Sequence, residues 1–240
     1  MPPPRHTTPS RLAPHASGLV LALALATGLA GCRPHVSGNG VLLKADCNAG
    51  TFDAVKLGLG LDATITVDPL ASGVTCVLSG DANLVPNITM TAPGGVLQAS
   101  DAPDFDRILP LKLVITAPAL HAVEASDAGA PEGDSTRVTV GNAATQALTV
   151  AGHDGAQITV TGPGAAGGTA TVTLGQSAIF FGFGYPVASA SVNLSGQAHA
   201  QLDSAGPVTG SAAGQSQVEV QGGGACAVVL AGTATCALRP

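Results

Sequence analysis

The cysteines are the residues whose chemistry can be read most directly from this sequence. Cys32 follows an apolar run, and the other four are Cys47, Cys76, Cys226 and Cys236. An even number of cysteines in an oxidising compartment indicates disulfides. Three pairings are possible, and local pairing predicts Cys47–Cys76 and Cys226–Cys236, one near each end of the fold. A four-cysteine metal site is the alternative, but the spacings contain no Cys-x-x-Cys pair of the kind common in zinc sites.

Acidic side chains that could catalyse a reaction or bind a cation are scattered through the second half of the chain. Hydrolysis of a glycosidic bond needs two paired carboxylates, and hard cations prefer carboxylate oxygens. The candidates are Glu124, Asp127, Glu132, Asp134, Asp154, Asp203 and Glu219. Three of them fall in one insertion containing Gly and Pro, residues 127–136. This insertion is more typical of a solvated loop, and a weak cation site is the alternative.

The histidines do not form a recognisable ligand set. His121, His153 and His199 are separated by 32 and 46 residues, which does not match the spacing of the repeats described below. They are interpreted as surface histidines, and the sequence predicts neither a metal nor a cofactor.

Four of the six aromatic residues lie in one stretch, IFFGFGYP at residues 179–186. On a regular strand Phe181, Phe183 and Tyr185 would share one face and Phe180 the other. The rings could fill the interior of a wide coil. The alternative is that Phe180 or Tyr185 is exposed as a ligand or partner contact, because exposed aromatics mark binding surfaces.

The elements that must position these residues are short strands. Triplets such as Val138-Thr139-Val140, Leu148-Thr149-Val150 and Ile158-Thr159-Val160 recur every ten residues and are followed by Gly, Ala, Asn, Asp or Ser. Alternation with period two predicts strands, and no apolar stripe persists at helical period. Over residues 111–238 the pattern predicts an all-β solenoid with about 20 residues per coil. An antiparallel β-sandwich is the alternative, because its strands have similar spacing.

Composition agrees with thin layers of small side chains. Aromatic residues make up 2% and charged residues 10% of the 240 residues. Ordinary domains contain about 25% charged residues. The formal net charge of −6 argues against nucleic acid as a partner, since phosphates are bound by clustered Lys and Arg.

The start of the chain is typical of an exported lipoprotein. Residues 1–31 combine Arg5, Arg11 and an apolar run that is too short to span a bilayer, as in a signal peptide. The run ends in Leu-Ala-Gly-Cys32, which resembles the bacterial lipobox, so Cys32 is the expected lipidation site. Residues 32–46 are predicted to be the lipidated cysteine and a tether, and residues 47–240 the folded domain. Arg33, in place of Asp, favours the outer membrane.

Several stretches in order resemble the head-GIN domain, a family described as auto-transporter adhesins and otherwise of unknown function. They are TFDAVKLGLGLDATITVD (51–68), GDANLVPNITMTAPGGVLQAS (80–100) and LKLVITAPALHAVEASDAG (111–129). The resemblance implies a right-handed parallel β-helix and carries no catalytic residues. The chain departs from the family pattern at residues 126–129, where Ser-Asp-Ala-Gly stands in place of the usual Ser-Gly-Ser, and in its extra cysteines.

These observations predict an exported, lipid-anchored envelope protein that acts as a non-enzymatic binding or adhesion module. Its expected partners are the membrane, through the lipid anchor, and an envelope protein or a glycan. Two alternatives remain open. One is a carbohydrate-active β-helix enzyme, which would need a cleft with paired carboxylates. The other is a structural spacer with a smooth, Thr-rich surface.

Overall fold

The computed structural model describes residues 35–100, 105–128, 130–131 and 133–240, which lie within one compact unit, Arg33–Pro240. The predicted signal peptide (1–31) and the predicted lipidation site Cys32 lie outside the described residues. In the part of the chain that is described, no helix is long and apolar enough to cross a membrane.

The all-β prediction is confirmed, because the described residues form two large sheets and only two short 3-10 turns, η1 (Val85–Asn87) and η2 (Pro93–Gly95). The ten-stranded sheet contains, in spatial order, β2 (Leu42–Asp46), β5 (Thr75–Asp81), β9 (Lys112–Ala117), β4 (Asp62–Val67), β11 (Arg137–Gly141), β13 (Gln157–Thr161), β15 (Ile179–Val187), β17 (His199–Ser204), β19 (Gln217–Gln221) and β21 (Thr235–Leu238). The nine-stranded sheet contains β20 (Cys226–Leu230), β18 (Val208–Ala212), β16 (Ser189–Leu194), β14 (Thr169–Leu174), β12 (Ala147–His153), β10 (Ala122–Ser126), β3 (Ala54–Leu57), β7 (Val96–Ser100) and β6 (Thr89–Thr91). A further pair joins β1 (Val36–Ser37) to β8 (Phe105–Asp106).

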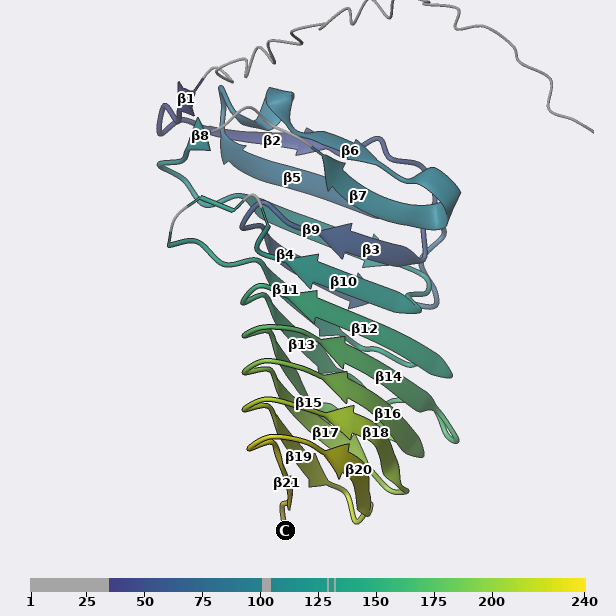
Figure 1. Cartoon of the computed structure of the whole chain (residues 1–240). Coiled ribbons are helices and arrows are strands. Elements are labelled where there is room, and N and C mark those ends of the chain that lie inside the picture. The colour runs from purple at the N-terminus through teal and green to yellow at the C-terminus, as the bar shows by residue number, and fades with distance from the viewer. Residues whose placement is uncertain (1–34, 101–104, 129, 132) are drawn as a thin grey trace, which may run out of the picture. The chain divides into compact units, whose positions relative to one another are not determined.

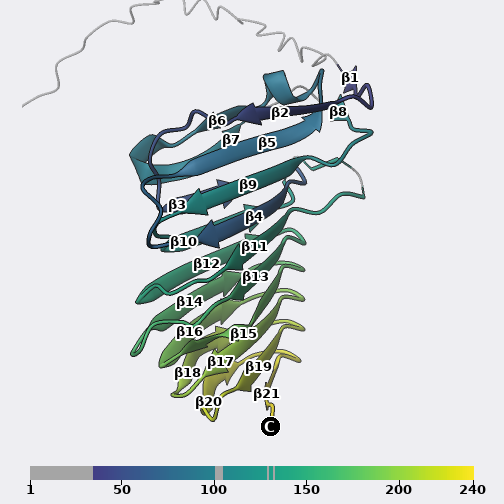
Figure 2. The ribbon, with the colours of Figure 1, turned by 180° about the vertical axis from the view of Figure 1, so that it is seen from behind.

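From β10 onward, successive strands alternate between the two sheets, and each pairs in parallel with the strand two places later. Ala147 of β12 is thus paired with Thr169 of β14, and His199 of β17 with Gln217 of β19. Within each sheet, the strands from β10 onward are stacked in sequence order in Figure 1, and Figure 2, seen from behind, brings the ten-stranded sheet to the front. The ten-residue spacing of the triplets therefore corresponds to the step from one sheet to the other, and about twice that spacing separates neighbouring strands of the same sheet.

The core lies between the two sheets and is built from the alternating aliphatic positions. On β11 Val138 and Val140 are buried, whereas Arg137 and Thr139 are exposed. The parallel register places each inward side chain beside its equivalent, so Val138 lies beside Ile158. Full burial of one such side chain contributes roughly 1.5–3 kcal/mol. Stacked aliphatic rows thus stabilise the sheets without large aromatic side chains.

The aromatic stretch breaks this alternation. β15 pairs Phe180 with Ala200 and Gly182 with Leu202, but the register shifts before Val187 meets Ser204. The extra residues form a β-bulge, which changes the face that a side chain occupies. Both Phe180 and Tyr185 therefore face the interior, although regular alternation would place them on opposite faces.

The alternative in which Phe180 or Tyr185 is an exposed ligand contact is consequently wrong, and the interpretation that these two rings fill the interior is confirmed. The two side chains are 1% and 2% exposed, and the rings fill space left by small neighbours such as Ala200. The Tyr185 hydroxyl donates a hydrogen bond to the carbonyl oxygen of Thr145 at 3.0 Å. Burial raises the pKa of Tyr185 above its ordinary value.

The predicted tether also extends too far. β2 pairs antiparallel with β5, from Leu42 opposite Asp81 to Asp46 opposite Val77. Leu43 and Ala45 are partly buried and pack against the core. A strand at a sheet edge has only one neighbour, and the alternation within β2 was too short to be recognised. The folded part therefore includes residues that were predicted to belong to the tether.

Both predicted disulfides are confirmed. Cys47–Cys76 joins the chain just after β2 to β5. Cys226–Cys236 joins β20 to β21 and so links the last strands of the two sheets.

Candidate functional site

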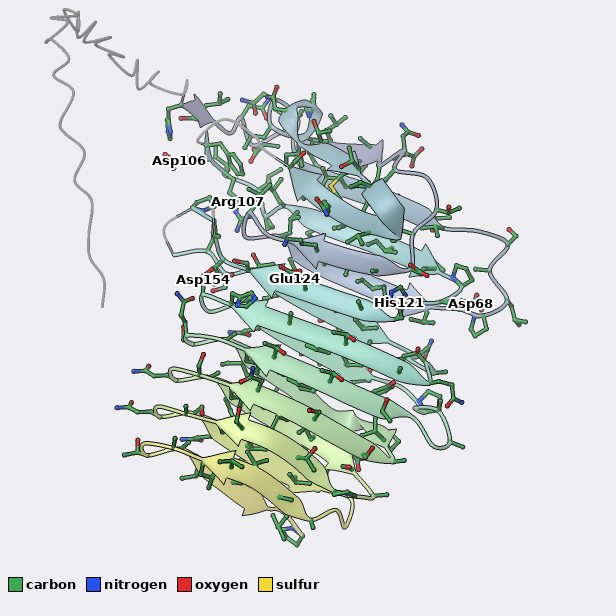
Figure 3. The ribbon with its side chains drawn as sticks, turned by 45° about the vertical axis from the view of Figure 1, so that its right-hand side comes forward. Asp68, Asp106, Arg107, His121, Glu124 and Asp154 are labelled. Carbon is green, nitrogen blue, oxygen red and sulfur yellow. A yellow bond between two sulfur atoms is a disulfide. The ribbon has the colours of Figure 1, made fainter. Side chains whose placement is uncertain are left out.

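A depression on the outer face of the nine-stranded sheet gathers several kinds of polar side chain. It has a volume of about 450 Å³ and lies where β3, β7, β10 and β12 end. It is lined by Lys56, Leu57, Gly58, Gln98, Ala99, Glu124, Ser126, Ala128, His153 and Asp154. Figure 3 shows Glu124 and Asp154 on the same side of the sheet.

One row of the depression follows directly from strand register. Gln98 on β7 is paired with Lys56 on β3, and Lys56 with Glu124 on β10. All three point outward because the residue before each is buried in the core (Leu97, Val55 and Val123). Neighbouring strands lie about 4.8 Å apart, so the three side chains form a continuous polar row. On β12 the row continues with Ala151, whose small side chain leaves this side open.

An ion pair lies in this row. The Lys56 ammonium is 2.8 Å from one carboxylate oxygen of Glu124. The two side chains are 54% and 36% exposed, and exposed pairs of this kind contribute about 0–1 kcal/mol to stability. Both groups therefore remain accessible to a ligand.

A second row contains Ser126 and His153, which are paired across β10 and β12. Asp154 follows at the corner with φ of 66°, in the left-handed region that Asp tolerates better than most residues. The Ser126 hydroxyl donates to the Asp154 carboxylate at 2.7 Å and accepts the Ala128 N–H at 3.1 Å. The Asp154 carboxylate is thus held by both the backbone conformation and the hydroxyl.

Part of the base of the depression is formed by the chain that follows β3, because β3 ends earlier than β10. β3 ends at Leu57, whereas β10, which pairs with it, continues to Ser126. At Gly58 a Cβ atom would lie 3.4 Å from the Ser126 carbonyl oxygen, so the chain passes close beneath β10 there. Ala99 and Ala128 contribute apolar surface between the polar groups, whereas the side chain of Leu57 is buried in the core.

The side chains of the depression can form hydrogen bonds with a ligand, but they do not form the free acid and base that a glycosidase needs. Glu124 and Asp154 line the same depression, as a glycosidase would require. Glu124 is paired with Lys56, however, and Asp154 accepts the Ser126 hydroxyl. The general acid of a glycosidase lies in an apolar environment, whereas the contacts of Glu124 and Asp154 are a cation and a hydroxyl.

The acidic insertion 127–136 uses its described carboxylates for structure. Asp127 accepts the N–H of Thr136 at 2.5 Å. Asp134 pairs with Arg107 at 2.7 Å, and Arg107 also donates to the Gly60 carbonyl oxygen at 2.8 Å. Glu132 lies outside the described residues. Within the described ranges, no group of three or more His, Cys, Asp or Glu side chains is placed to bind a metal ion.

The three histidines belong to different strands or adjoin them: His121 precedes β10, His153 ends β12 and His199 begins β17. His121 pairs with Asp53 at 3.2 Å, and both side chains are more than half exposed. His153 lines the depression. His199 lies 3.8 Å from Glu219, and its Nε2 is buried without a hydrogen-bond partner among the described residues.

Glu219 and Asp203 take part in a network on the outer face of the ten-stranded sheet. Glu219 accepts from Gln201 at 3.2 Å and pairs with Arg239. The hydrogen bond from Arg239 holds the pKa of Glu219 below its ordinary value. Gln221 donates to Asp203 at 3.3 Å. These contacts join neighbouring strands, so both Glu219 and Asp203 have a structural role.

One buried carboxylate was not recognised in the sequence. Asp81 is 0% exposed and accepts backbone N–H groups from Gly40 (2.6 Å), Ile108 (3.0 Å) and Leu109 (2.9 Å). Burial alone raises the pKa of Asp81, but the backbone hydrogen bonds outweigh it, and the pKa lies below its ordinary value. Asp81 therefore organises the loops around β2 and β5 and is not exposed to a ligand.

The match to the family described as "Putative auto-transporter adhesin, head GIN domain" covers residues 51–224. The chain belongs to this family. Solved structures similar to this head-GIN protein include a putative adhesin from Bacteroides fragilis, with 12% identity, 84% of this chain and 98% of that chain covered, and a TM-score of 0.61. A putative lipid binding protein from Parabacteroides distasonis has 11% identity, covers 86% of this chain and 100% of its own, and has a TM-score of 0.51. At these identities the likeness is one of fold. No curated protein matches the chain.

The depression could not be recognised as a unit from the sequence. Lys56 and Gln98 belong to no sequence motif, and Glu124 and Asp154 are two of several scattered acidic residues. The sequence does contain polar residues at outward positions of these strands. They can be recognised as one site only when the strand register is known.

Proposed function

We propose that this head-GIN protein is an exported, lipid-anchored binding module of the cell envelope with an adhesion-type role and no catalytic activity of its own. The observation that carries the proposal is the family match over residues 51–224. The two disulfides support export, since such bonds persist in oxidising compartments.

We infer that the paired sheets form a right-handed parallel solenoid, as the family resemblance implies. The parallel pairing of each strand with the strand two places later supports this geometry. A sandwich built from hairpins would pair consecutive strands in antiparallel fashion, which within the described residues occurs only near the beginning, as in β6–β7. A crystal structure in which the coils run left-handed would contradict this inference.

Lipid attachment at Cys32 is the anchoring mechanism that we propose. Diacylglycerol together with an N-terminal acyl chain supplies more than one anchoring chain, which is enough for stable attachment. The variant Cys32→Ala should lose metabolic labelling with a fatty acid and should leave the membrane fraction. Labelling that persists in this variant would contradict the proposal. Fractionation of the unaltered protein tests the outer-membrane assignment.

The binding role is tested with the purified mature chain immobilised and exposed to envelope fractions and to a glycan array. Saturable retention of a component that is recovered chemically unchanged is the expected result. Release of shortened glycan products would support the enzyme alternative instead. An absence of retention from both sources would favour the structural spacer.

A further inference from the structure

We propose that the depression formed by Lys56, Gln98, Glu124, Ser126, His153 and Asp154 binds a neutral, hydroxyl-rich ligand, namely a short segment of a glycan. This inference rests on the proposed binding function and names the place and the chemical class of the ligand. It presents Lys, Gln, Glu, Ser, His and Asp side chains together, whereas three other depressions of the described surface present at most Asp, Asn and Thr, or only Ser and Thr.

The local charge argues against an anionic ligand. The depression is lined by one ammonium, Lys56, and by two carboxylates, Glu124 and Asp154, and Lys56 is already paired with Glu124. A phosphate or carboxylate entering the depression would meet a net negative surface on a chain whose formal charge is −6. A largely apolar ligand would remove these charges from water without replacing their hydrogen bonds, which is costly. A neutral polar ligand has neither disadvantage.

The free hydrogen-bonding capacity matches sugar hydroxyls. An ionised carboxylate can accept about four hydrogen bonds, so Glu124 and Asp154 each retain capacity after their internal contact. The Gln98 amide offers both donors and an acceptor. It makes no side-chain hydrogen bond to another described residue. Adjacent hydroxyls of a sugar are both donors and acceptors, and therefore suit a row of carboxylate, amide and ammonium groups.

Size and preorganisation favour the same class. A volume of about 450 Å³ falls within the range of about 300–1,000 Å³ typical of small-molecule sites. Ala99, which is only partly buried, and Ala128, which is exposed, supply apolar surface for the C–H groups of a sugar ring. The polar row is fixed by strand register, and Asp154 by its corner conformation and by Ser126. Little ordering is therefore required when a ligand binds.

The test is an NMR titration of the isotope-labelled mature chain with four probes: cellotetraose, chitotetraose, tetragalacturonate and inorganic phosphate. We expect a neutral tetrasaccharide to shift the backbone amide signals of residues 56–58, 98–99, 124–128 and 153–154. Tetragalacturonate and phosphate should shift them less at equal concentration. Stronger binding of either anionic probe would overturn the proposed ligand class.

Two variants and one control localise the site. Asp154→Asn keeps the size and the tolerance for the corner conformation but loses the charge, and should weaken binding about tenfold or more. Gln98→Ala should weaken it about three- to tenfold. Thr171→Ala, an exposed position on the same sheet, should leave affinity unchanged. Melting temperatures near that of the parent show that the variants remain folded.

The outcomes separate this inference from the proposed function. Glycan binding that is insensitive to both variants, or shifts confined to the ten-stranded sheet, would overturn the site and leave the binding function standing. Retention of an envelope component with no response to either neutral tetrasaccharide would overturn the ligand class alone. Failure of retention from every source would overturn both.

Discussion

Among the described carboxylates, Asp81 is the one whose loss should lower the stability of the fold most. Its two oxygens accept N–H groups from three backbone positions on two segments, Gly40 on one and Ile108 and Leu109 on the other. A buried donor left without a partner costs about 1–3 kcal/mol. The carboxylate therefore fixes loops that no regular strand pairing holds.

The variant Asp81→Asn should lower the free energy of unfolding by about 1–3 kcal/mol, because an amide presents one acceptor oxygen and turns an N–H₂ group toward backbone donors. Urea denaturation of the mature chain measures the effect. Asp68→Asn, at a position that is only partly buried and accepts one local N–H, is the matched control and should change stability by about 0.5 kcal/mol at most. Equal losses in both variants would contradict this role for Asp81.

Asp81 also predicts a pH dependence. Its folded pKa lies below the ordinary value of 3.8. A depressed folded pKa contributes stability that is present above the unfolded pKa and is lost as the pH falls through the folded pKa. Stability of the parent should therefore fall more steeply than that of Asp81→Asn as the pH is lowered below about 4. Parallel curves in urea titrations at several pH values would contradict the assignment.

At the scale of elements, β15 shows how a bulge changes the meaning of a sequence pattern. Regular alternation places Phe181, Phe183 and Tyr185 together, and the register shift instead buries Phe180 with Tyr185. The strands can be predicted from their triplets because Val, Leu and Ile alternate with Thr. The bulge in β15 cannot be predicted in this way, because it depends on whether the ring of Phe180 fits beside Gly182 in the interior.

Phe180→Ala should destabilise the protein by about 3–5 kcal/mol, because it leaves a cavity between the sheets. The half-buried Phe181 is the matched control on the next position, and Phe181→Ala should cost clearly less. Thermal unfolding monitored by circular dichroism compares the two. A larger loss for Phe181→Ala would show that the ring assignments within β15 are reversed.

The C-terminal disulfide is an element-scale constraint as well. Cys226 and Cys236 are separated by 10 positions in the sequence, and restricting so short a loop in the unfolded chain stabilises by about 2–3 kcal/mol. The double variant Cys226→Ser, Cys236→Ser should lose about that amount by calorimetry without reductant. An unchanged melting temperature would mean that the last strands are held by strand pairing alone.

At the scale of the whole molecule, periodicity predicted the repeated part and failed where the period was interrupted. The sequence offset between paired strands stays nearly constant from β12, where Ala147 meets Thr169, to β21, where Thr235 meets Gln217. The offset is longer between β10 and β12, where Ala122 meets Thr149, because the insertion 127–136 lies between them. The antiparallel strands β2, β5 and β6 have no repeat, and for this reason the tether prediction was too long.

The candidate site lies in this irregular part. Lys56, Gln98, Glu124 and Asp154 come from segments separated by insertions of different length, so no fixed spacing connects them. Their meeting depends on β3 pairing with both β7 and β10, a parallel arrangement that skips several intervening strands. The sequence shows the residue types, but only the register of the paired strands shows that these residues are neighbours.

The disulfide between β20 and β21 has a mechanical consequence for a protein pulled at its C-terminus. Without it, tension would peel β21 away from β19 first and then β20 away from β18, one after the other. With Cys226 bonded to Cys236, the two strands share the load and must detach together. Resistance to unravelling at this end is thus set by two rows of parallel hydrogen bonds acting at once.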